Sequence, residues 1–262
     1  MRSSLRLFYL GGLTSYRALF SWLTPWILIP SFVIAPIVQA LLFSYVGRAA
    51  GVGSDAFFLI GNAVQYASVP CLFAMGNTVS GERFQGTLPL LLASPARRIP
   101  LFLGRSLPVI LNGFAVAMVA LFGGGLLLGV RVPWSALAPL AFVVAITSFS
   151  CAGLGVFTAA IALRVRESAV LSNLGYGVLL IFSGANIPLY LLPSWMATVA
   201  GWLPMTHGIA AARLVAGGSG MASIGGLLLQ EAGLGLMYIL IGLVLLAYFE
   251  NEARRLSTLD AF

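Results

Sequence analysis

Six uncharged apolar runs divide this sequence, and each is close to the length that crosses a lipid bilayer. A transmembrane helix needs about 20 consecutive, mostly apolar residues. Only 8% of the 262 residues are charged, whereas a soluble domain has about 25%. Too few charges remain to cover a water-facing surface, so a soluble globular fold is excluded. We predict an all-α integral membrane protein whose six transmembrane helices cover residues 23–46, 57–79, 106–129, 135–163, 168–187 and 225–249.

The basic residues indicate how the chain is oriented. All fourteen are Arg, and six spans put both termini on one side of the membrane with the second and fourth loops. Eleven Arg lie on that side, and Arg48, Arg131 and Arg213 lie on the other. Because cytoplasmic loops are enriched in Lys and Arg, we expect both termini in the cytoplasm. No nucleic-acid partner is expected, since no basic stripe is interleaved with aromatic residues.

Missing residue types exclude several kinds of chemistry. The chain has no Lys, the residue with which a phosphate-binding loop reaches the β- and γ-phosphates. Its single His, His207, excludes a zinc site built from two or three His. We therefore expect no catalytic residue and no metal or cofactor bound by this chain.

Residues 3–21 differ from the six runs because Arg6 and Arg17 interrupt them. Apolar and aromatic residues recur between these Arg at roughly helical spacing. This pattern predicts an amphipathic helix at the cytoplasmic membrane interface.

Neutral polar residues lie inside the predicted spans, and two interpretations of them stay open. Asn62 and Gln65 are three residues apart and share one helix face, as do Asn173 and Tyr176. Such residues either bond neighbouring helices together or line a translocation path for an amphipathic substrate. The path candidates are Gln39, Asn62, Gln65, Asn173, Tyr176 and Ser183.

No acidic residue or Arg lies at the middle of a predicted span, and Glu231 is expected near the outer end of the last one. Carriers coupled to ion gradients usually place ionisable residues at the membrane centre. Coupling to an ion gradient is therefore disfavoured.

Two segments between the spans have unusual sequences. The predicted cytoplasmic loop 80–105 holds a short helix that Thr87 caps and Ser94-Pro95 ends. Three consecutive Leu on that helix predict burial against a partner or at the membrane surface. The outer segment 188–212 is apolar but broken by Pro residues, which predicts a re-entrant pair of short helices. Its candidate gate residues are Pro188, Pro193, Trp195, Trp202, Pro204 and His207.

These two segments carry a resemblance to a known family. The first reads Gly81-Glu82-Arg83-x-x-Gly86-Thr87-Leu88-x-x-Leu91-Leu92-Ala93-Ser94-Pro95, followed by Gly104-Arg105. The second reads Ser183-Gly184-x-x-x-Pro188, then Leu192-Pro193, Leu203-Pro204-x-Thr206-His207 and Arg213. Both resemble loops of ABC-2 type export permeases, in the drug-exporter and polysaccharide-exporter branch. The resemblance covers residues 1–262 as a single transmembrane domain of the type V exporter kind.

The resemblance implies a permease subunit of an ATP-driven exporter in a bacterial plasma (inner) membrane. ATP and Mg²⁺ would be bound by a separate ABC nucleotide-binding subunit, and a second permease, a copy or a sister subunit, would pair with this chain among the membrane lipids. Residues 86–94 would form the coupling helix that docks on the ATPase. The coupling residues implied are Glu82, Arg83, Gly86, Thr87, Leu88, Leu91, Leu92, Ser94 and Pro95.

The mechanism so implied is alternating access, and the apolar path favours a hydrophobic or amphipathic small molecule or a lipid-like product. The alternative is an ion-coupled secondary carrier or channel that works without an ATPase. An intramembrane enzyme is disfavoured because the single His is expected at the outer interface and no G-x-S-x-G motif occurs.

Overall fold

The computed structural model describes residues 24–84, 98–165 and 168–255, and every regular element within these ranges is a helix. The predicted interfacial helix 3–21 lies outside the described residues. So do the implied coupling residues Gly86, Thr87, Leu88, Leu91, Leu92, Ser94 and Pro95. Glu82 and Arg83 fall in the last turn of a helix, and their side chains are not described.

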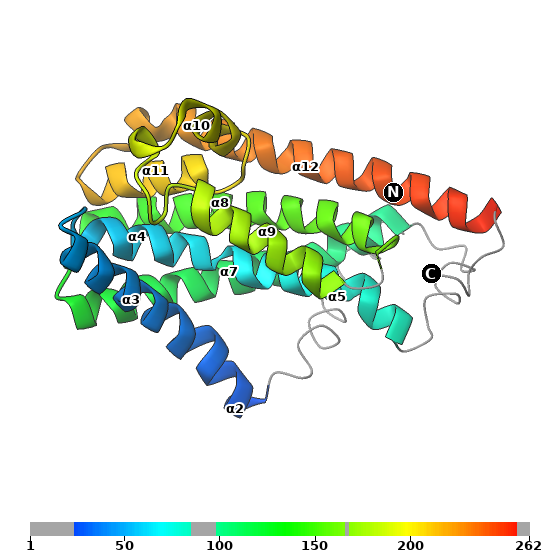
Figure 1. Cartoon of the computed structure of the whole chain (residues 1–262), viewed down its shortest axis with the longest axis horizontal. Helices are drawn as coiled ribbons and strands as arrows, with labels where there is room; N and C mark the ends of the chain where they lie inside the picture. The colour runs from blue at the N-terminus through cyan, green and yellow to red at the C-terminus, as the bar shows by residue number, and fades with distance from the viewer. Residues whose placement is uncertain (1–23, 85–97, 166–167, 256–262) are drawn as a thin grey trace.

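The helices follow one another along the chain as an antiparallel bundle (Figure 1). They are α2 (Pro25–Leu28), the π-helical turn η1 (Ile29–Ile34), α3 (Ala35–Ala50), α4 (Asp55–Tyr66), α5 (Ser68–Phe84), α7 (Arg98–Leu128), α8 (Trp134–Ala162), α9 (Ser168–Phe182), the 3₁₀ turn η2 (Leu189–Leu191), α10 (Ser194–Gly201), α11 (Thr206–Ala216) and α12 (Met221–Arg255).

Five stretches of helix in the described part of the chain are long and apolar enough to cross a membrane. They are Pro25–Ala50, Asp55–Asn77, Gly104–Leu128, Trp134–Ala162 and Met221–Phe249. The fifth predicted span, residues 168–187, contains the shorter helix α9, which ends at Phe182 because the chain turns at Gly184 with φ +77°. A sixth span therefore stays a prediction.

The first span changes its helical winding near its start. The π-helical turn η1 joins α2 to α3 within one continuous stretch, and Pro30 and Pro36 stand at its two ends. A Pro lacks the N–H that an α-helix needs from its interior, so the hydrogen-bond pattern is altered around it. Figure 1 shows that α2 lies away from the rest of the bundle, whereas Pro36 and Ala40 in the first half of α3 are buried.

The core of the bundle lies along α8. This helix is covered by α5 and α12 along its length, and 67% of its most apolar 18-residue stretch is buried. Glycines let α12 approach it closely. A Cβ built on Gly153 of α8 would come within 2.5 Å of the carbonyl oxygen of Gly235 on α12.

The two ends of the bundle gather different elements (Figure 1). At one end lie the α3–α4 turn, the α7–α8 turn, α10, α11 and the start of α12. At the other end lie the end of α5, the start of α7 and the end of α12, where Arg164 forms an ion pair with Glu252. The chain therefore runs repeatedly from one end of the bundle to the other.

Candidate functional site

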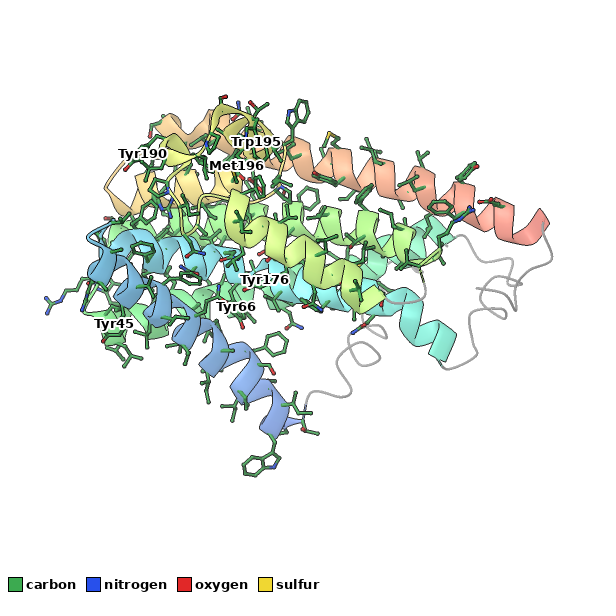
Figure 2. The ribbon with its side chains drawn as sticks, viewed as in Figure 1. Tyr45, Tyr66, Tyr176, Tyr190, Trp195 and Met196 are labelled. Atoms are coloured by element: carbon green, nitrogen blue, oxygen red, sulfur yellow. The ribbon has the colours of Figure 1, made fainter. Side chains whose placement is uncertain are left out.

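Polar side chains from α3, α4, α9 and the turn after α9 meet between these helices. We call this group the polar cluster and define it as Gln39, Asn62, Gln65, Tyr176 and Asn186. Gln39 donates from Nε2 to Asn62 Oδ1 at 3.1 Å and to Gln65 Oε1 at 3.3 Å, and the Tyr176 hydroxyl donates to Gln39 Oε1 at 2.7 Å. Figure 2 shows Tyr176 and its neighbour Tyr66 on the side of the bundle that α3 faces. The sequence alone did not predict that residues so far apart along the chain are joined.

One backbone carbonyl determines the direction of every bond in the polar cluster. The Nδ2 group of Asn62 donates to the carbonyl oxygen of Phe58 at 2.9 Å, and a carbonyl only accepts. Asn62 Oδ1 must then face Gln39, whose amide nitrogen must face it in turn. The same reasoning orients Asn186, whose Oδ1 accepts from Asn62 Nδ2 at 2.8 Å.

This fixed direction leaves the polar cluster with spare donors. The amide nitrogens of Gln65 and Asn186 are buried and have no hydrogen-bond partner within the described residues. The side-chain amide oxygens of the four Asn and Gln residues each accept a bond from within the cluster. An unpaired buried donor costs roughly 1–3 kcal/mol. The polar cluster therefore holds two buried amide nitrogens without an acceptor among the described residues.

Two path candidates lie outside the polar cluster. Asn173 is exposed and donates to the carbonyl of Ala169 in its own helix at 2.8 Å. Asn173 and Tyr176 thus do not act on one partner, although their spacing suggested it. Ser183 is buried where α9 ends, and its hydroxyl accepts from Ala185 N at 3.4 Å. Its described contact is therefore local to the end of α9.

The candidate gate residues lie on α10 and α11 and in the segments that precede these helices. Pro188 and Pro204 are buried, whereas Pro193, Trp195 and Trp202 are exposed. Trp195 and Trp202 are each 62% exposed. Trp195 lies on α10, and its ring packs edge-on against that of Phe182 (Figure 2).

His207 lies on the first turn of α11. Its ring Nε2 is 3.1 Å from the carbonyl oxygen of Gly201, so Nε2 is the protonated nitrogen and donates. This hydrogen bond joins the start of α11 to the end of α10, as expected of a hydrogen-bonding His at this position.

A buried carboxylate ties α11 to α12. Glu231 Oε1 accepts from Met205 N at 2.5 Å, and Oε2 accepts from Gly208 N at 3.0 Å. Met205 precedes α11 with φ 69°, a conformation that costs energy for a residue other than Gly. The N-terminus of a helix carries a partial positive charge that favours a carboxylate. Glu231 therefore stabilises the turn at Met205 and holds the start of α11 against α12.

Glu231 lies ten residues beyond the start of α12. Because α12 begins at Met221, the candidate span Met221–Phe249 has its midpoint at residue 235, four residues from Glu231. Its expected place near the outer end of the span stays a prediction. Its side chain is fully buried, and both of its oxygens are occupied by backbone N–H groups.

Arg213 joins three segments at the same end of the bundle. Its guanidinium donates to the carbonyl oxygens of Gly184 at 2.8 Å, Ala185 at 2.9 Å and Phe57 at 3.1 Å, and it lies 3.5 Å from the centroid of the Phe57 ring. Burial lowers the pKa of Arg213 to about 10, which leaves it charged at neutral pH. A planar guanidinium suits this combination of carbonyl and ring contacts.

The sequence reasoning left Asn186, Arg213 and Glu231 off its list of site residues. A signal existed for two of them, because Glu231 and Arg213 are isolated charges in apolar surroundings. For Asn186 no sequence signal distinguished it from an ordinary turn residue after a helix.

Comparison with known proteins agrees with the helical arrangement. The sequence profile of the ABC-2 type transporter family matches residues 13–216, which is 204 of the 262 residues. No match was found among curated proteins. Because the family match covers most of a chain that has several membrane-spanning helices, the chain belongs to the ABC-2 type transporter family and is a multi-pass membrane permease of an ABC transporter, a transport component that is not itself catalytic.

Proposed function

We propose that this permease exports a hydrophobic or amphipathic small molecule, of the kind handled by drug exporters, across a bacterial plasma membrane. Its family associates with ABC ATPase subunits. In the proposed mechanism that separate subunit binds ATP and Mg²⁺, two permeases pair, and alternating access moves the substrate between them. Both termini face the cytoplasm, where loop 80–105 receives the motion of the ATPase.

The polar cluster is the observation that supports this choice of substrate. It lies on the side of the bundle that α3 faces, among apolar helices, and its spare donors are the amide nitrogens of Gln65 and Asn186. A mainly apolar substrate with carbonyl or ether oxygens complements these buried donors, because its oxygens pair amide nitrogens that are otherwise unpaired.

A matched pair of variants tests the path. Gln65→Leu removes a spare donor from the polar cluster, whereas Asn173→Leu changes an exposed amide that bonds only its own helix. The test measures resistance in cells that carry the whole transporter. We expect Gln65→Leu to lower resistance to compounds rich in acceptor oxygens and to affect resistance to purely aliphatic cations at least fivefold less. Asn173→Leu should leave the resistance profile unchanged. Equal profiles for the two variants, at equal membrane yield, contradict the assignment.

A second experiment tests the coupling segment. We expect an ABC ATPase subunit to co-purify with this chain from its native membrane. Replacing Leu91 and Leu92 by Asp puts charge on the proposed docking helix and should abolish both co-purification and transport while the chain still inserts. Unchanged transport in that variant contradicts the coupling assignment and leaves the path assignment standing.

An ion-coupled carrier is the second candidate, and the observation in its favour is that Glu231 is buried on a candidate membrane-spanning helix. Against it, both carboxylate oxygens accept backbone bonds, which is the geometry of a structural anchor. Reconstituted vesicles without any ion gradient separate the two functions. ATP-driven uptake under that condition supports the exporter, and uptake that needs an imposed gradient supports the carrier.

A further inference from the structure

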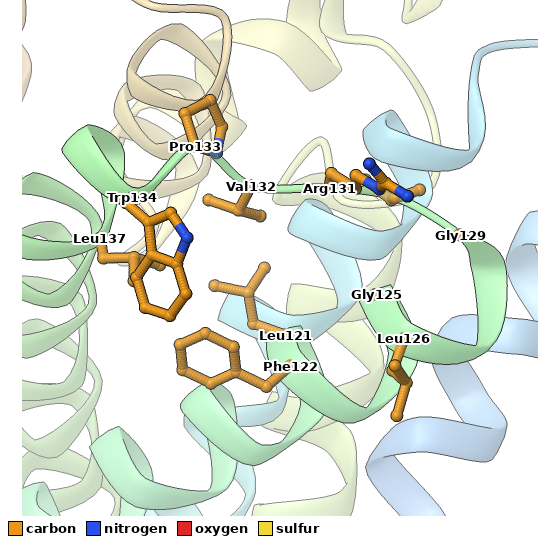
Figure 3. Close-up of a pocket in the computed structure, with 11 residues that line it drawn as sticks. Leu121, Phe122, Gly125, Leu126, Gly129, Arg131, Val132, Pro133, Trp134 and Leu137 are labelled. Carbon is orange, nitrogen blue, oxygen red and sulfur yellow. The ribbon is translucent and has the colours of Figure 1, made fainter.

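A pocket of about 650 Å³ lies at the end of the bundle where α7 turns back into α8 (Figure 3). It is separate from the polar cluster and from the contacts of Glu231 and Arg213. Its volume falls within the roughly 300–1,000 Å³ of ordinary ligand pockets. Neither the family nor the proposed transport function assigns it a role.

The pocket arises from the way in which α7 ends. Gly129 takes the left-handed conformation with φ 70°, and the N–H of Val130 donates to the carbonyl of Gly125 at 3.0 Å. This is the pattern of a glycine-terminated helix. The chain then passes through Pro133 before α8 begins at Trp134. Gly125 and Gly129 both line the pocket, and a Cβ on Gly129 would meet no atom within 4 Å (Figure 3).

The lining combines an apolar surface with one cation. Leu121, Phe122 and Leu137 form apolar walls, and the Trp134 ring stands at the edge with 89% of its surface exposed. Arg131 is the one charged side chain among the described residues that line the pocket.

The three Arg at this end of the bundle differ in their partners. Arg48 forms an ion pair with Asp55, and Arg213 donates to backbone carbonyls. Arg131 is exposed and has no carboxylate partner within the part of the chain that the structure describes. Its guanidinium is thus available to an anion at the mouth of an apolar pocket.

We propose that this pocket binds an anionic phospholipid. An acyl chain lies against Leu121, Phe122 and Leu137, and the phosphate pairs with Arg131, since a guanidinium matches phosphate oxygens in a two-bond geometry. Trp134 lies at the level where Trp rings meet lipid headgroups, at the start of a membrane-spanning helix. The inference requires only that the chain spans a membrane, so it stands or falls independently of the transported substrate.

Quenching of Trp134 fluorescence by brominated lipid tests the proposal. The full chain is reconstituted in phosphatidylcholine vesicles that contain an increasing fraction of phosphatidylglycerol with brominated acyl chains. In a second series the phosphatidylcholine carries the brominated acyl chains and the phosphatidylglycerol does not. The Trp134 signal is the difference between the wild type and Trp134→Phe. We expect phosphatidylglycerol to be preferred about fivefold, the factor that corresponds to about 1 kcal/mol for one cation near an anionic bilayer.

Variants at two Arg residues supply the control. Arg131→Gln should reduce the preference for phosphatidylglycerol to less than twofold. Arg131→Lys should keep part of it, because the charge remains but the two-bond geometry of the guanidinium is lost. Arg48→Gln, at the same end of the bundle, should keep the full preference.

Three results would overturn the proposal. Equal quenching by both lipids in the wild type would mean ordinary bulk-lipid contact. Absence of quenching in a folded protein would mean that a second copy or another segment covers the pocket. Loss of the preference on addition of inorganic phosphate would mean a site for free anions, without a lipid.

Discussion

The amide of Gln39 joins two halves of the polar cluster because it is both a double donor and an acceptor. Its Nε2 serves Asn62 and Gln65, and its Oε1 serves Tyr176. The sense of these bonds follows from the Phe58 carbonyl. A side chain of the same shape with only acceptors therefore cannot replace Gln39.

We predict that Gln39→Glu is more destabilising than Gln39→Met. The carboxylate places acceptors against the oxygens of Asn62 and Gln65, whereas Met removes the bonds without adding repulsion. Each interhelical hydrogen bond in a membrane contributes about 0.6 kcal/mol, so Gln39→Met should lower the free energy of unfolding by about 2 kcal/mol. Titration of the purified chain with sodium dodecyl sulfate measures it, and Asn173→Leu is the control with an expected change below about 0.5 kcal/mol. A smaller loss for Glu than for Met would contradict the bond directions.

The Glu231 carboxylate gives a second prediction. Glu231→Gln replaces one acceptor oxygen by a donor that faces a backbone N–H, so one of the two donors at Met205 and Gly208 loses its partner. We expect a loss of about 1–3 kcal/mol in unfolding free energy. The matched control is Glu252→Gln, which breaks the more exposed ion pair with Arg164 and should cost at most about 1 kcal/mol. Thermal unfolding in detergent compares the two, and equal shifts would rule out the anchoring role of Glu231.

Helices α8 and α12 are held close by glycines at matching positions. A Cβ on Gly235 would come within 2.8 Å of Ser150 Cα, and one on Gly242 within 2.9 Å of Phe157 N. Such close approach lets backbones pack where lipid supplies no hydrophobic force between helices. This glycine-lined contact between α8 and α12, which we call the seam, holds α12 and its Glu231 beside α11.

Two glycines on α12 separate this packing effect from helix propensity. Gly235→Ala should lower the unfolding free energy by about 1–3 kcal/mol because the methyl group forces α12 away from α8. Gly233→Ala meets no atom within 4 Å and should be neutral or stabilising by up to about 1 kcal/mol. Thermal unfolding of both variants in one detergent measures the difference. A destabilising Gly233→Ala together with a neutral Gly235→Ala would show that the seam lies elsewhere.

The bundle as a unit has two ends with different contents. One holds α10, α11 and the α3–α4 and α7–α8 turns, and the other holds the Arg164–Glu252 pair and the ends of α5 and α12 (Figure 1). If the Arg distribution reports orientation, the first end faces outward.

Cysteine labelling tests this orientation. In a chain without Cys71 and Cys151, we expect Ser135→Cys, at the start of α8, to react with a membrane-impermeant maleimide added to intact cells. Val165→Cys, just beyond the end of α8, should react only after the membrane is opened. Both positions are exposed, so access to the reagent decides the outcome. The reverse pattern would invert the topology.

Much of the helical architecture followed from composition and run length. Long apolar stretches without charges must form helices in lipid, because no other open structure satisfies its backbone there. The site was less predictable. The structure joins four of the path candidates by hydrogen bonds, namely Gln39, Asn62, Gln65 and Tyr176. It leaves Asn173 outside this group and adds Asn186, for which the sequence held no signal.

The sequence by itself determined that the chain is helical and membrane-spanning, and its two motif-bearing segments identified the family that the profile match confirms. These properties depend on local composition and short spacings, which are written along the chain. Only the tertiary structure decided that Asn62 pairs with Asn186, that Glu231 anchors α11, and that a pocket of about 650 Å³ opens beside Arg131. Each of these depends on how every helix is rotated about its axis and packs against its neighbours. The pattern of apolar residues does not specify that rotation, because lipid and the protein interior are equally apolar.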